Sequence, residues 1–352
     1  MLIFEAEKRN NMMKIIVDDK IPYIREPLAA LNCEVVYMPG SAINKETVKD
    51  ADALVIRTRT HCSRELLEGS KVKFIATATI GYDHIDAEYC KTAGIEWTNA
   101  AGCNSGAVEQ YVHSSLLLLQ KKKGIDLKDA VLGIVGVGHV GSRVARMAKG
   151  LGMKVLLNDP PRKDNGEDGF VGLDEIAEKS DIITFHTPLI KEGKYKTYHL
   201  ADASFFGALR RRPFIINTSR GNVIDTVQIK RALSSSVIND IVMDVWENEP
   251  NIDRDLLNSI FIATPHIAGY SADGKMNATR SSLMSLYSFF NINKKIDISL
   301  PPSPFNKGAG YYNTGYNYLE VYNPMNDTAI LRKEPENFES LRGNYNLRRE
   351  IL

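Results

Sequence analysis

The segment AVLGIVGVGHVG, from Ala130 to Gly141, constrains the fold of this chain more than any other part of the sequence. Its apolar first half predicts a short buried strand, and Gly136, Gly138 and Gly141 then follow with G-x-G-x-x-G spacing. The residues after them, Val140–Leu151, show helical periodicity. A strand, a glycine turn and a helix N-terminus together favour binding of a pyrophosphate, because unpaired backbone N–H groups and the helix dipole attract anions.

Each glycine of this turn has a separate expected role. Gly136 permits the tight turn, Gly138 lets the backbone approach the phosphates, and Gly141 lets the helix pack closely against the strand. The alternative is a glycine-rich helix start in an ordinary β-α-β unit. That alternative leaves an acidic residue after the next strand unexplained.

The acidic residue is Asp159, at the end of a second predicted strand, Lys154–Asn158. Its carboxylate can bond the ribose hydroxyls of an adenosine, and it would repel the 2′-phosphate of NADP. Arg162 is close enough to complicate this preference, but we expect Pro160 and Pro161 to direct the chain away from the ribose. The sequence therefore predicts NAD as the cofactor.

Length and charge limit the class of protein. With 352 residues the chain exceeds the size at which one hydrophobic core normally keeps growing, so two or more domains are expected. Its 44 Lys and Arg residues nearly balance its 43 Asp and Glu residues. This balance argues against a general nucleic-acid or membrane-surface partner, although local basic sites are compatible with it.

The cysteines and the apolar runs bear on compartment. The cysteines are Cys33, Cys62, Cys90 and Cys103. Because they include no C-x-x-C pair, they predict neither a metal site nor a disulfide framework, and we expect buried thiols in a reducing compartment. Leu116–Leu119 is too short to span a bilayer. We expect a cytoplasmic protein in which residues 1–12 form a disordered extension.

Short apolar runs separated by helical stretches precede the glycine turn. This alternation predicts a parallel, doubly wound α/β domain of about 100 residues with its own core and a flavodoxin-like arrangement. It contains no glycine fingerprint. Its predicted strands are Lys14–Val17, Glu34–Tyr37, Ala53–Ile56, Phe74–Ala78 and Glu96–Thr98.

A second doubly wound domain, of the Rossmann type, is predicted around the glycine turn. The helix Ser105–Lys123 is expected to connect the two domains, and a long helix, Ser271–Asn291, is expected to return to the first. We therefore assign residues 1–104 and 270–295 to a substrate-binding domain and residues 105–269 to the dinucleotide-binding domain. The predicted strands of the second domain are Val131–Val135, Lys154–Leu157, Asp181–Phe185, Phe214–Asn217, Ile238–Met243 and Phe261–Ala263.

Residues 296–352 differ in composition from the rest. Six of the fifteen tyrosines follow residue 300, prolines at 301, 302 and 304 indicate a linker, and YNYLEVY, Tyr316–Tyr322, predicts a strand. Such a segment is too short to fold alone. We expect its aromatic side chains to pack on the body of the protein or on a second subunit, the alternative being a loosely docked tail.

Polar side chains follow three strands of the second domain, at the edge of the sheet where ligands bind. They are Arg220 in TSRG, Glu249 in DVWENEP and His266 in TPHIAG. Oxidation of a 2-hydroxy acid requires a cation for the carboxylate, a base for the hydroxyl proton, and an acid that orients the base. Each residue alone could be a structural ion pair, a solvated loop acid or a turn histidine, but their joint occurrence favours catalysis.

These motifs also carry a family resemblance. GIVGVGHVG with Asp159, HTPL at 186–189, NTSRG at 217–221, DVWENEP at 244–250 and PHIAG at 265–269 resemble the D-isomer-specific 2-hydroxyacid dehydrogenase family over about Lys14 to Asn291. The stretches KIIVDDKIPY, FIATATIGYDHID, AAGCN, LLNDPPR, TFHTPL with KYKTYHL, and PHIAGYSADGK resemble one branch of it. This resemblance implies a phosphorylated 2-hydroxy acid as substrate and a homodimer held partly by the C-terminal segment.

The resemblance also implies a role for each matching residue. Arg220 would bind the substrate carboxylate, His266 would accept the hydroxyl proton, and Glu249 would stabilise the imidazolium. Asp159 would bind the adenosine ribose. The other implied cofactor residues are Gly136, Gly138, His139, Val140, Gly141, Thr187, Thr218, Ser219, Asp244 and Gly269. The implied substrate residues are Thr58, which stands where the family more often has serine, and Thr79 and Tyr270.

A phosphorylated substrate also needs a cation, and IRTRT supplies two at the end of a first-domain strand. We expect Arg57 to contribute to the phosphate site, whereas Arg59 could equally be a surface residue that balances Glu65 and Glu68. Two other substrates remain open, 3-phosphoglycerate and glyoxylate or hydroxypyruvate. A protein that binds NAD as a sensor without catalysis also remains open, since fold alone does not determine function.

Overall fold

The computed structural model describes residues 12–299 and 315–351. The expected N-terminal extension, the proline linker and part of the tyrosine-rich tail lie outside these residues. The chain divides into two compact units. Of the described residues, unit 1 contains 12–104 and 272–299, and unit 2 contains 105–271 and 315–351. The C-terminal helices therefore group with the unit that contains the glycine turn.

Unit 1 is a parallel five-stranded sheet with the order β2-β1-β3-β4-β5. Its strands are β1 (Lys14–Asp18), β2 (Glu34–Met38), β3 (Ala53–Ile56), β4 (Phe74–Thr77) and β5 (Glu96–Asn99). Its helices are α2 (Arg25–Ala29), α3 (Lys45–Val48), α4 (Arg64–Leu67), α5 (Ala87–Ala93) and α13 (Ala272–Phe289), with a 3-10 turn η1 (Gly40–Ala42). This strand order is the flavodoxin-like one, and the order reverses between β1 and β3.

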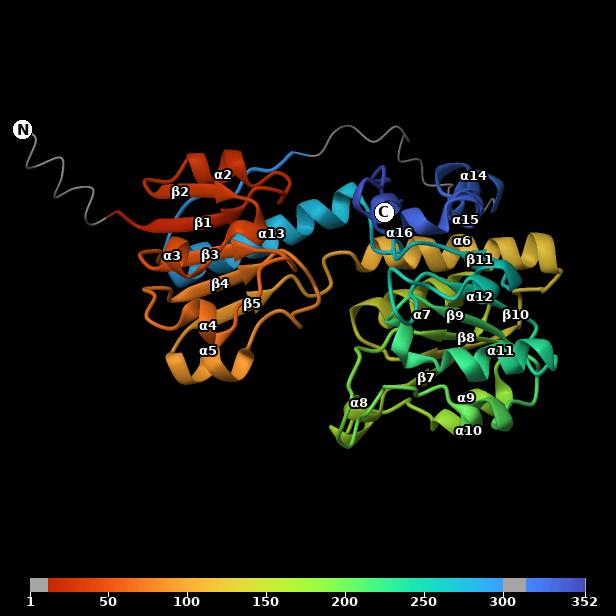
Figure 1. Cartoon of the computed structure of the whole chain (residues 1–352). Coiled ribbons are helices and arrows are strands. Elements are labelled where there is room, and N and C mark those ends of the chain that lie inside the picture. Colours follow the sequence, from red (N-terminus) through yellow and green to blue (C-terminus); the bar gives the residue numbers. More distant parts are fainter. Residues whose placement is uncertain (1–11, 300–314, 352) are drawn as a thin grey trace, which may run out of the picture. The chain divides into compact units, whose positions relative to one another are not determined.

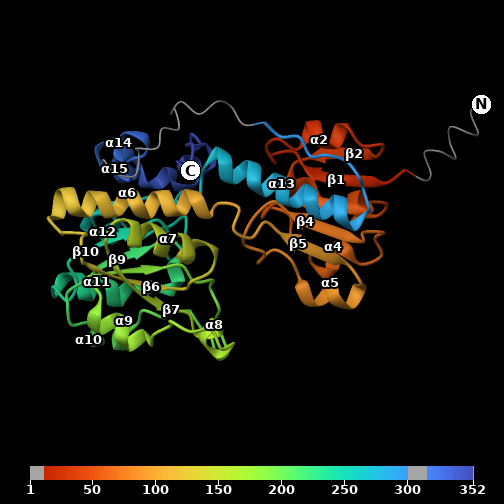
Figure 2. The ribbon, with the colours of Figure 1, turned by 180° about the vertical axis from the view of Figure 1, so that it is seen from behind.

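Alternate residues of these strands pack into two different layers. Ile16, Leu54 and Ile75 belong to one buried cluster. Val17 and Val55 belong to the other, which also takes Leu283, Leu286 and Tyr287 from α13. The helix predicted over 271–291 is thus present, and Figure 2 shows it lying across the sheet on the side of β4 and β5.

Unit 2 is a parallel six-stranded sheet with the order β11-β10-β9-β8-β6-β7. Its strands are β6 (Val131–Val135), β7 (Lys154–Asn158), β8 (Ile182–Phe185), β9 (Phe214–Asn217), β10 (Asp240–Met243) and β11 (Ile262–Ala263). An isolated parallel bridge joins Leu157 of β7 to Phe170. Phe170 thus occupies the position of the third strand of a Rossmann sheet, reduced to one residue, and the order reverses between β6 and β8.

The helices of unit 2 cover both faces of its sheet. They are α6 (Ser105–Lys123), α7 (His139–Gly150), α8 (Pro160–Asp164), α9 (Leu173–Lys179), α10 (Ala203–Ala208), α11 (Thr226–Ser234), α12 (Arg254–Ser259), α14 (Gly315–Val321), α15 (Pro324–Lys333) and α16 (Phe338–Gly343), with 3-10 turns η2 (Gly221–Val223) and η3 (Pro335–Asn337). The connector helix predicted over 105–123 is present as α6. No helix in the described parts of the chain is both long and apolar enough to cross a membrane.

The C-terminal segment departs from the prediction in one respect. The strand predicted over Tyr316–Tyr322 is wrong, because these residues lie in α14 and the turn that ends it. Aromatic residues favour strands, but Tyr318 and Tyr322 are also four residues apart and so share one face of a helix. Both are buried in the cluster that includes α6, and Figures 1 and 2 show α14 and α15 beside α6.

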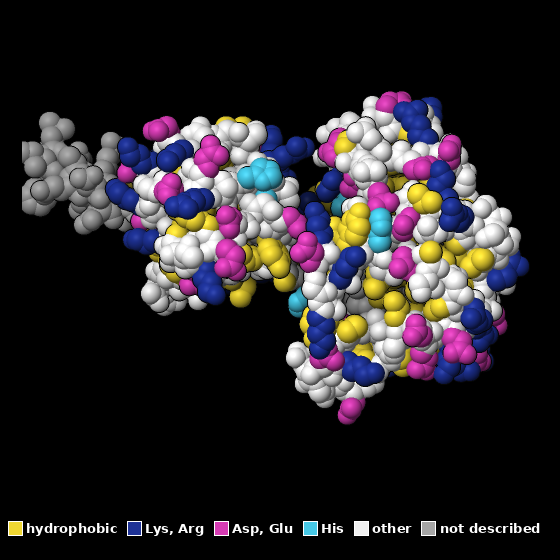
Figure 3. Space-filling view, turned by 60° about the horizontal axis from the view of Figure 1, so that its bottom comes forward, with side chains coloured by type: hydrophobic (Ala, Val, Ile, Leu, Met, Phe, Trp, Pro, Cys, Tyr) yellow, Lys and Arg dark blue, Asp and Glu magenta, His cyan; other side chains and the backbone are white. Residues whose placement is uncertain are grey.

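Charged side chains of both signs are interspersed over the face of the molecule shown in Figure 3. This distribution matches the near-zero net charge of the chain. On that face, the cations available to an anionic ligand are individual side chains rather than a broad basic surface.

Candidate active site

The glycine turn after β6 has the geometry that its spacing predicts. Gly136 has a φ of +87°, in the left-handed region. A Cβ at Gly141 would lie 2.1 Å from the carbonyl oxygen of Gly136, so a side chain there would push the helix off the turn. A Cβ at Gly138 would meet nothing within 4 Å. The backbone at Gly138 therefore borders open space at the start of α7, where no side chain caps the helix and the exposed His139 begins it.

Asp159 fixes this turn from the end of the neighbouring strand. Its Oδ2 accepts a hydrogen bond of 2.8 Å from the Val137 amide, and its Oδ1 accepts one of 3.2 Å from the Arg162 amide at the start of α8. A carboxylate has further lone pairs, so this arrangement still leaves acceptors for ribose hydroxyls.

The expectation for Arg162 was wrong. Pro160 and Pro161 occupy the first positions of α8, where the fixed φ of proline suits a helix start, and they do not lead the chain away. The Arg162 guanidinium returns to the turn and donates a hydrogen bond of 2.7 Å to the Val137 carbonyl, and it also pairs with Glu167. The cation beside Asp159 is thus already bound within the protein.

The HTPL segment after β8 presents a polar atom that fits a bound cofactor. The hydroxyl of Thr187 is buried and has no hydrogen-bond partner among the described residues. His186 beside it contacts Thr184 at 3.0 Å and Thr218 at 3.1 Å, and burial lowers its pKa to about 3. A neutral imidazole therefore joins the loops of β8 and β9. Together with the open space at Gly138, the orphaned Thr187 hydroxyl fits NAD.

His266 and Glu249 form the central polar pair of unit 2. The Nδ1 of His266 lies 2.8 Å from the Oε2 of Glu249, and both side chains are largely buried. The Trp246 amide donates to the Oε1 of Glu249 at 2.8 Å. Burial raises the pKa of the Glu249 carboxyl, but the hydrogen bond and charge of His266, the Trp246 amide and Arg342 together hold that pKa below its usual value.

The loop that carries His266 is held by Asp244. His266 has a φ of +57°, a left-handed conformation that is unfavourable for a side chain of this size. The Oδ1 of Asp244 accepts a hydrogen bond of 2.7 Å from the Ile267 amide, and its Oδ2 accepts one of 2.9 Å from the Ala268 amide. These bonds, with one of 2.6 Å from the Thr264 hydroxyl, compensate the strained turn.

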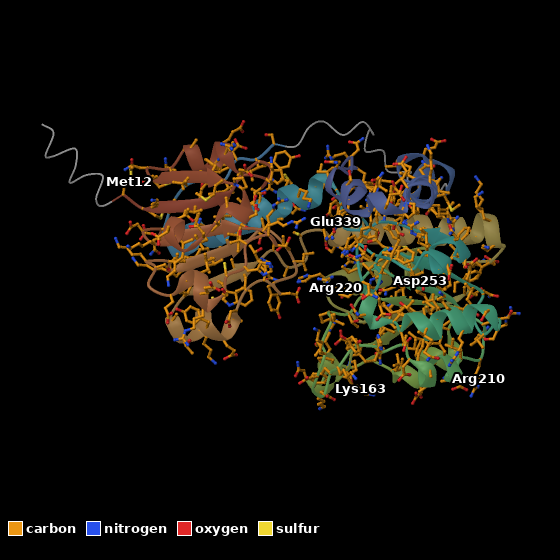
Figure 4. All side chains as sticks on the ribbon, in the orientation of Figure 1. Met12, Lys163, Arg210, Arg220, Asp253 and Glu339 are labelled. Carbon is orange, nitrogen blue, oxygen red and sulfur yellow. The ribbon has the colours of Figure 1, made fainter. Side chains whose placement is uncertain are left out.

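Arg220 lies on the loop after β9, at the margin of unit 2 in Figure 4. Its Nη1 donates a hydrogen bond of 2.8 Å to the Ser219 carbonyl, and its side chain is half-buried. The next residue, Gly221, packs so tightly that a Cβ there would lie 1.9 Å from the carbonyl carbon of Trp246. The loop of Arg220 and the loop of Glu249 are therefore in direct backbone contact.

The predicted substrate residues of unit 1 lie at the carboxyl ends of β3 and β4. The Nε of Arg57 lies 3.2 Å from a carboxylate oxygen of Asp18, which is fully buried at the end of β1. Thr58 is exposed. The Thr79 hydroxyl contacts the Thr77 hydroxyl at 2.7 Å and donates to the Gly81 carbonyl at 3.0 Å. Glu68, considered as a partner for Arg59, instead pairs with Arg64.

Tyr270 contacts a residue that no sequence motif indicated. Its hydroxyl accepts a hydrogen bond of 3.2 Å from the Nε of Arg342 in α16. His186 and Trp246 were also missed as individual residues, although they lie inside the quoted motifs HTPL and DVWENEP. Arg342 belongs to the C-terminal segment, where the sequence offers no catalytic motif that could have identified it.

Comparisons with known proteins agree with this geometry. The sequence model of the D-isomer specific 2-hydroxyacid dehydrogenase NAD binding domain matches residues 104–268. Erythronate-4-phosphate dehydrogenase of Bacteroides thetaiotaomicron is 57% identical over 339 residues, which cover 96% of this chain and 97% of that protein. The enzyme of that name from Shigella flexneri is 42% identical over 350 residues, covering 96% and 92%.

Two solved structures show the same fold. D-lactate dehydrogenase of Aquifex aeolicus, complexed with NAD and lactic acid, is 26% identical with a TM-score of 0.65, covering 79% of this chain and 95% of that one. NAD-bound 3-phosphoglycerate dehydrogenase of Entamoeba histolytica is 29% identical with a TM-score of 0.67, covering 80% and 97%.

The sheets, the glycine turn and these similarities define an NAD-dependent oxidoreductase of the D-isomer-specific 2-hydroxyacid dehydrogenase class. Within that class, the chain belongs to the erythronate-4-phosphate dehydrogenase family.

Proposed function

We propose that this chain oxidises 4-phospho-D-erythronate to 2-oxo-3-hydroxy-4-phosphobutanoate, with NAD as hydride acceptor, in the biosynthesis of pyridoxal 5′-phosphate. The observation that carries the proposal is the 2.8 Å contact between His266 and Glu249. This pair lies on strand-end loops of an NAD-binding unit, in a chain that is 57% identical to a named relative over nearly its whole length. The substrate follows from the relatives, and the chemistry follows from the pair.

His266 is the proposed acceptor of the C2 hydroxyl proton. Because its Nδ1 faces a carboxylate that only accepts hydrogen bonds, Nδ1 carries the proton of the neutral ring, and Nε2 keeps a free electron pair. The hydroxyl proton moves to Nε2, the C2–O bond becomes a carbonyl, and the C2 hydrogen leaves with its electron pair. Bound NAD would supply the acceptor for that hydride. Glu249 stabilises the imidazolium that results.

Arg220 is the proposed anchor of the substrate carboxylate. A guanidinium binds a carboxylate through two parallel hydrogen bonds, which orients C2 and polarises its oxygen. The Ser219 carbonyl accepts one hydrogen bond from Nη1 of Arg220, and the other N–H groups of the guanidinium remain for the substrate.

The cofactor residues follow from the geometry of unit 2. The turn at Gly136, Gly138 and Gly141, with His139 and Val140, would hold the pyrophosphate, and Asp159 would hold the adenosine ribose. The nicotinamide half would be held by Thr187, Thr218, Ser219, Asp244 and Gly269. The orphaned Thr187 hydroxyl and the open space at Gly138 support these assignments.

Unit 1 and the C-terminal segment have proposed roles as well. We assign the phosphate of the substrate to Arg57, whose guanidinium is only partly covered by its contact with Asp18, and the rest of the substrate to Thr58, Thr79 and Tyr270. We propose a cytoplasmic homodimer in which residues 296–352 contribute to the contact between subunits. Size-exclusion chromatography with light scattering tests the dimer.

The test of the function is formation of NADH from synthetic 4-phospho-D-erythronate, followed at the absorbance of NADH. D-3-phosphoglycerate in the same direction, and glyoxylate or hydroxypyruvate with NADH in reverse, are the competing substrates. We expect 4-phospho-D-erythronate to have the highest kcat/KM, and a clear preference for another substrate would overturn the assignment. If the protein bound NAD but oxidised none of these acids, the result would favour a protein that senses NAD without catalysis.

The residue-level test uses Arg220→Ala. We expect kcat/KM to fall by roughly 10²-fold or more while NAD still binds, because the variant loses the carboxylate anchor but keeps the glycine turn. An unchanged kcat/KM would remove Arg220 from the mechanism.

A further inference from the structure

The C-terminal helix α16 brings the guanidinium of Arg342 to the catalytic pair. The Nη1 of Arg342 lies 3.9 Å from the Oε2 of Glu249, and its Nε donates to the Tyr270 hydroxyl at 3.2 Å. Oε2 is the same oxygen that contacts His266 at 2.8 Å. One carboxylate oxygen thus faces an imidazole and a guanidinium at once.

The groups around Glu249 come from three parts of unit 2. His266 comes from the loop after β11, the Trp246 amide from the loop after β10, and Arg342 from α16. Glu339, one turn before Arg342, lies 3.9 Å from the guanidinium, and Tyr270 completes the set. The nearest groups to the carboxyl therefore favour its ionised form, and Arg342 is the permanent cation among them.

The position of Arg342 is determined by the packing of the whole C-terminal segment. Phe338, at the start of α16, is fully buried in the same cluster as Trp246. Beyond α16, Arg348 is buried and donates hydrogen bonds to the carbonyls of Ile267, Ala268 and Tyr270. These bonds fix the loop that carries His266. The guanidinium of Arg342 is therefore held between two anchored points.

We propose that Arg342 is a positioning residue for the catalytic pair. Its fixed charge adds to the larger effect of His266 in favouring the ionised form of Glu249, and its contact with Oε2 directs that carboxylate at Nδ1 of His266. The same charge opposes protonation of the pair. The C-terminal segment thus contributes to the chemistry of the site as well as to its packing. This inference rests on the proposed role of His266 as the proton acceptor, and it does not depend on which 2-hydroxy acid is oxidised.

Loss of the charge has a defined electrostatic sign. In Arg342→Gln the imidazolium of His266 no longer experiences the nearby cation, so the pair binds a proton more readily. The acidic limb of the kcat/KM profile should move to higher pH by about half a pH unit, since the guanidinium is partly screened by solvent. At pH values below that limb kcat should be about threefold lower than in the wild type, which is the factor that half a pH unit represents. KM should change little, because the variant alters proton acceptance and not substrate binding.

The experiment compares three full-length variants by kcat and KM from pH 5 to pH 9 and by thermal unfolding. Arg342→Lys keeps the charge and should restore the wild-type position of the acidic limb. Arg332→Gln is the matched control, because Arg332 lies in α15 of the same segment and donates to the Leu257 carbonyl at 3.2 Å, away from the pair. We expect it to lower thermal stability and leave the limb in place.

Two results would overturn the proposal. One is an acidic limb that stays in place in Arg342→Gln while thermal stability and rate fall together, as in the control. The other is a limb that moves equally in Arg342→Lys and Arg342→Gln, which would exclude the charge as the cause. Activity of the wild type on another 2-hydroxy acid would refute the proposed substrate and still allow this test with that acid.

A readout without substrate tests the same contact. The Nδ1–H proton of His266, bonded to Glu249, should give a downfield proton NMR signal that is identified by its loss in Glu249→Gln. We expect that signal to shift in Arg342→Gln and to be retained in Arg342→Lys and Arg332→Gln. An unchanged signal in Arg342→Gln would contradict the proposal even if the chain oxidised no acid at all.

Discussion

The described residues of unit 2 include two histidine–glutamate pairs with nearly equal contact distances, one through Nδ1 of the histidine and one through Nε2. His266 lies 2.8 Å from Glu249, and His199 lies 2.7 Å from Glu247. The two glutamates are only two residues apart, on the loop that follows β10. Both carboxyls have a pKa below the usual value, because hydrogen bonds and histidine charge outweigh the effect of burial.

The surroundings of the two pairs differ. Glu247 also accepts hydrogen bonds from the side chain of Asn222 at 3.2 Å and from the Thr226 amide at 3.1 Å. The second nitrogen of His199 lies 3.6 Å from Asp225, and the ring stacks on Tyr198. Both nitrogens of His199 and both carboxylate oxygens of Glu247 therefore have local partners. The pair joins η2 and α11 to the β10 loop.

In the His266 pair, only one of the two imidazole nitrogens has a hydrogen-bond partner among the described residues. Among the described residues, no hydrogen bond is made by Nε2 of His266, and the carboxylate faces Arg342. A histidine–carboxylate contact therefore does not by itself identify a catalytic site. The open Nε2 of His266 and the approach of Arg342 to its carboxylate distinguish the two.

The largest expected difference between the pairs is in catalysis. His266→Ala should lower turnover by about 10²-fold to 10⁴-fold, as expected for the loss of a general base, while NAD binding persists. His199→Ala is the matched control and should keep most of the activity. Steady-state kinetics and NAD titration measure both, and equal losses of turnover would show that the comparison is wrong.

Gly221→Ala should disturb both pairs at once through the backbone. Its Cβ would lie 1.9 Å from the carbonyl carbon of Trp246 and 2.4 Å from the amide nitrogen of Glu247, so the β10 loop must move. We expect a loss of about 3 kcal/mol in unfolding free energy, at the upper end of overpacking effects. Gly207→Ala in α10 is the control, since nothing lies within 4 Å of its Cβ. Similar stabilities of the two variants in urea would contradict the packing described here.

Glu247→Gln and Glu249→Gln should separate stability from activity. Glu247→Gln should cost about 1.5 kcal/mol of unfolding free energy, because several hydrogen bonds lose a charged acceptor, and should keep most of the turnover. Glu249→Gln should have the larger effect on kcat. Denaturant unfolding gives the free energy of unfolding of the two variants, and steady-state kinetics gives their kcat. A larger loss of kcat in Glu247→Gln than in Glu249→Gln would show that the roles of the two pairs are reversed.

The smallest expected effect is on the pH dependence of stability. Both carboxyls have a lowered pKa in the folded state, so the unfolded state binds more protons near the usual value of 4.5. Their stabilisation is complete above that pH and is lost as the pH falls through the folded-state pKa. Thermal unfolding between pH 3 and pH 7 should show a shallower acid loss in each glutamine variant than in the wild type. If both variants lost stability in acid as steeply as the wild type, the lowered pKa values of the two carboxyls would be contradicted.

Most of the fold could be predicted because its elements are local. β3 is a continuous apolar run, and β9 is apolar up to its last residue, as parallel strands buried on both faces require. The glycine turn has a spacing that few other local structures share. The contact between His266 and Glu249 could be anticipated because the carboxyl ends of parallel strands lie along one edge.

The C-terminal segment contains features that local sequence patterns could not predict. Tyr318 and Tyr322 satisfy a strand propensity and a helical spacing equally well, and only packing against α6 decides between them. Arg342 carries no motif, and its contact with Glu249 joins residues 93 positions apart (342 − 249). The single-residue strand position at Phe170 and the return of Arg162 to the glycine turn also depend on three-dimensional contacts that no local pattern encodes.

The hydrogen bonds from Arg348 to the carbonyls of Ile267, Ala268 and Tyr270 have a consequence for biosynthesis of the enzyme. During translation the histidine loop is made before Arg348, which lies 81 positions after Ile267 (348 − 267), so a nascent chain can assemble its sheets and still lack a rigid proton acceptor. Maturation of activity would then follow the docking of Arg348 on this loop. A chain ending at Leu347 should fold to near-native helical content by circular dichroism and turn over poorly, whereas full activity of that truncated chain would show that the loop needs no such support.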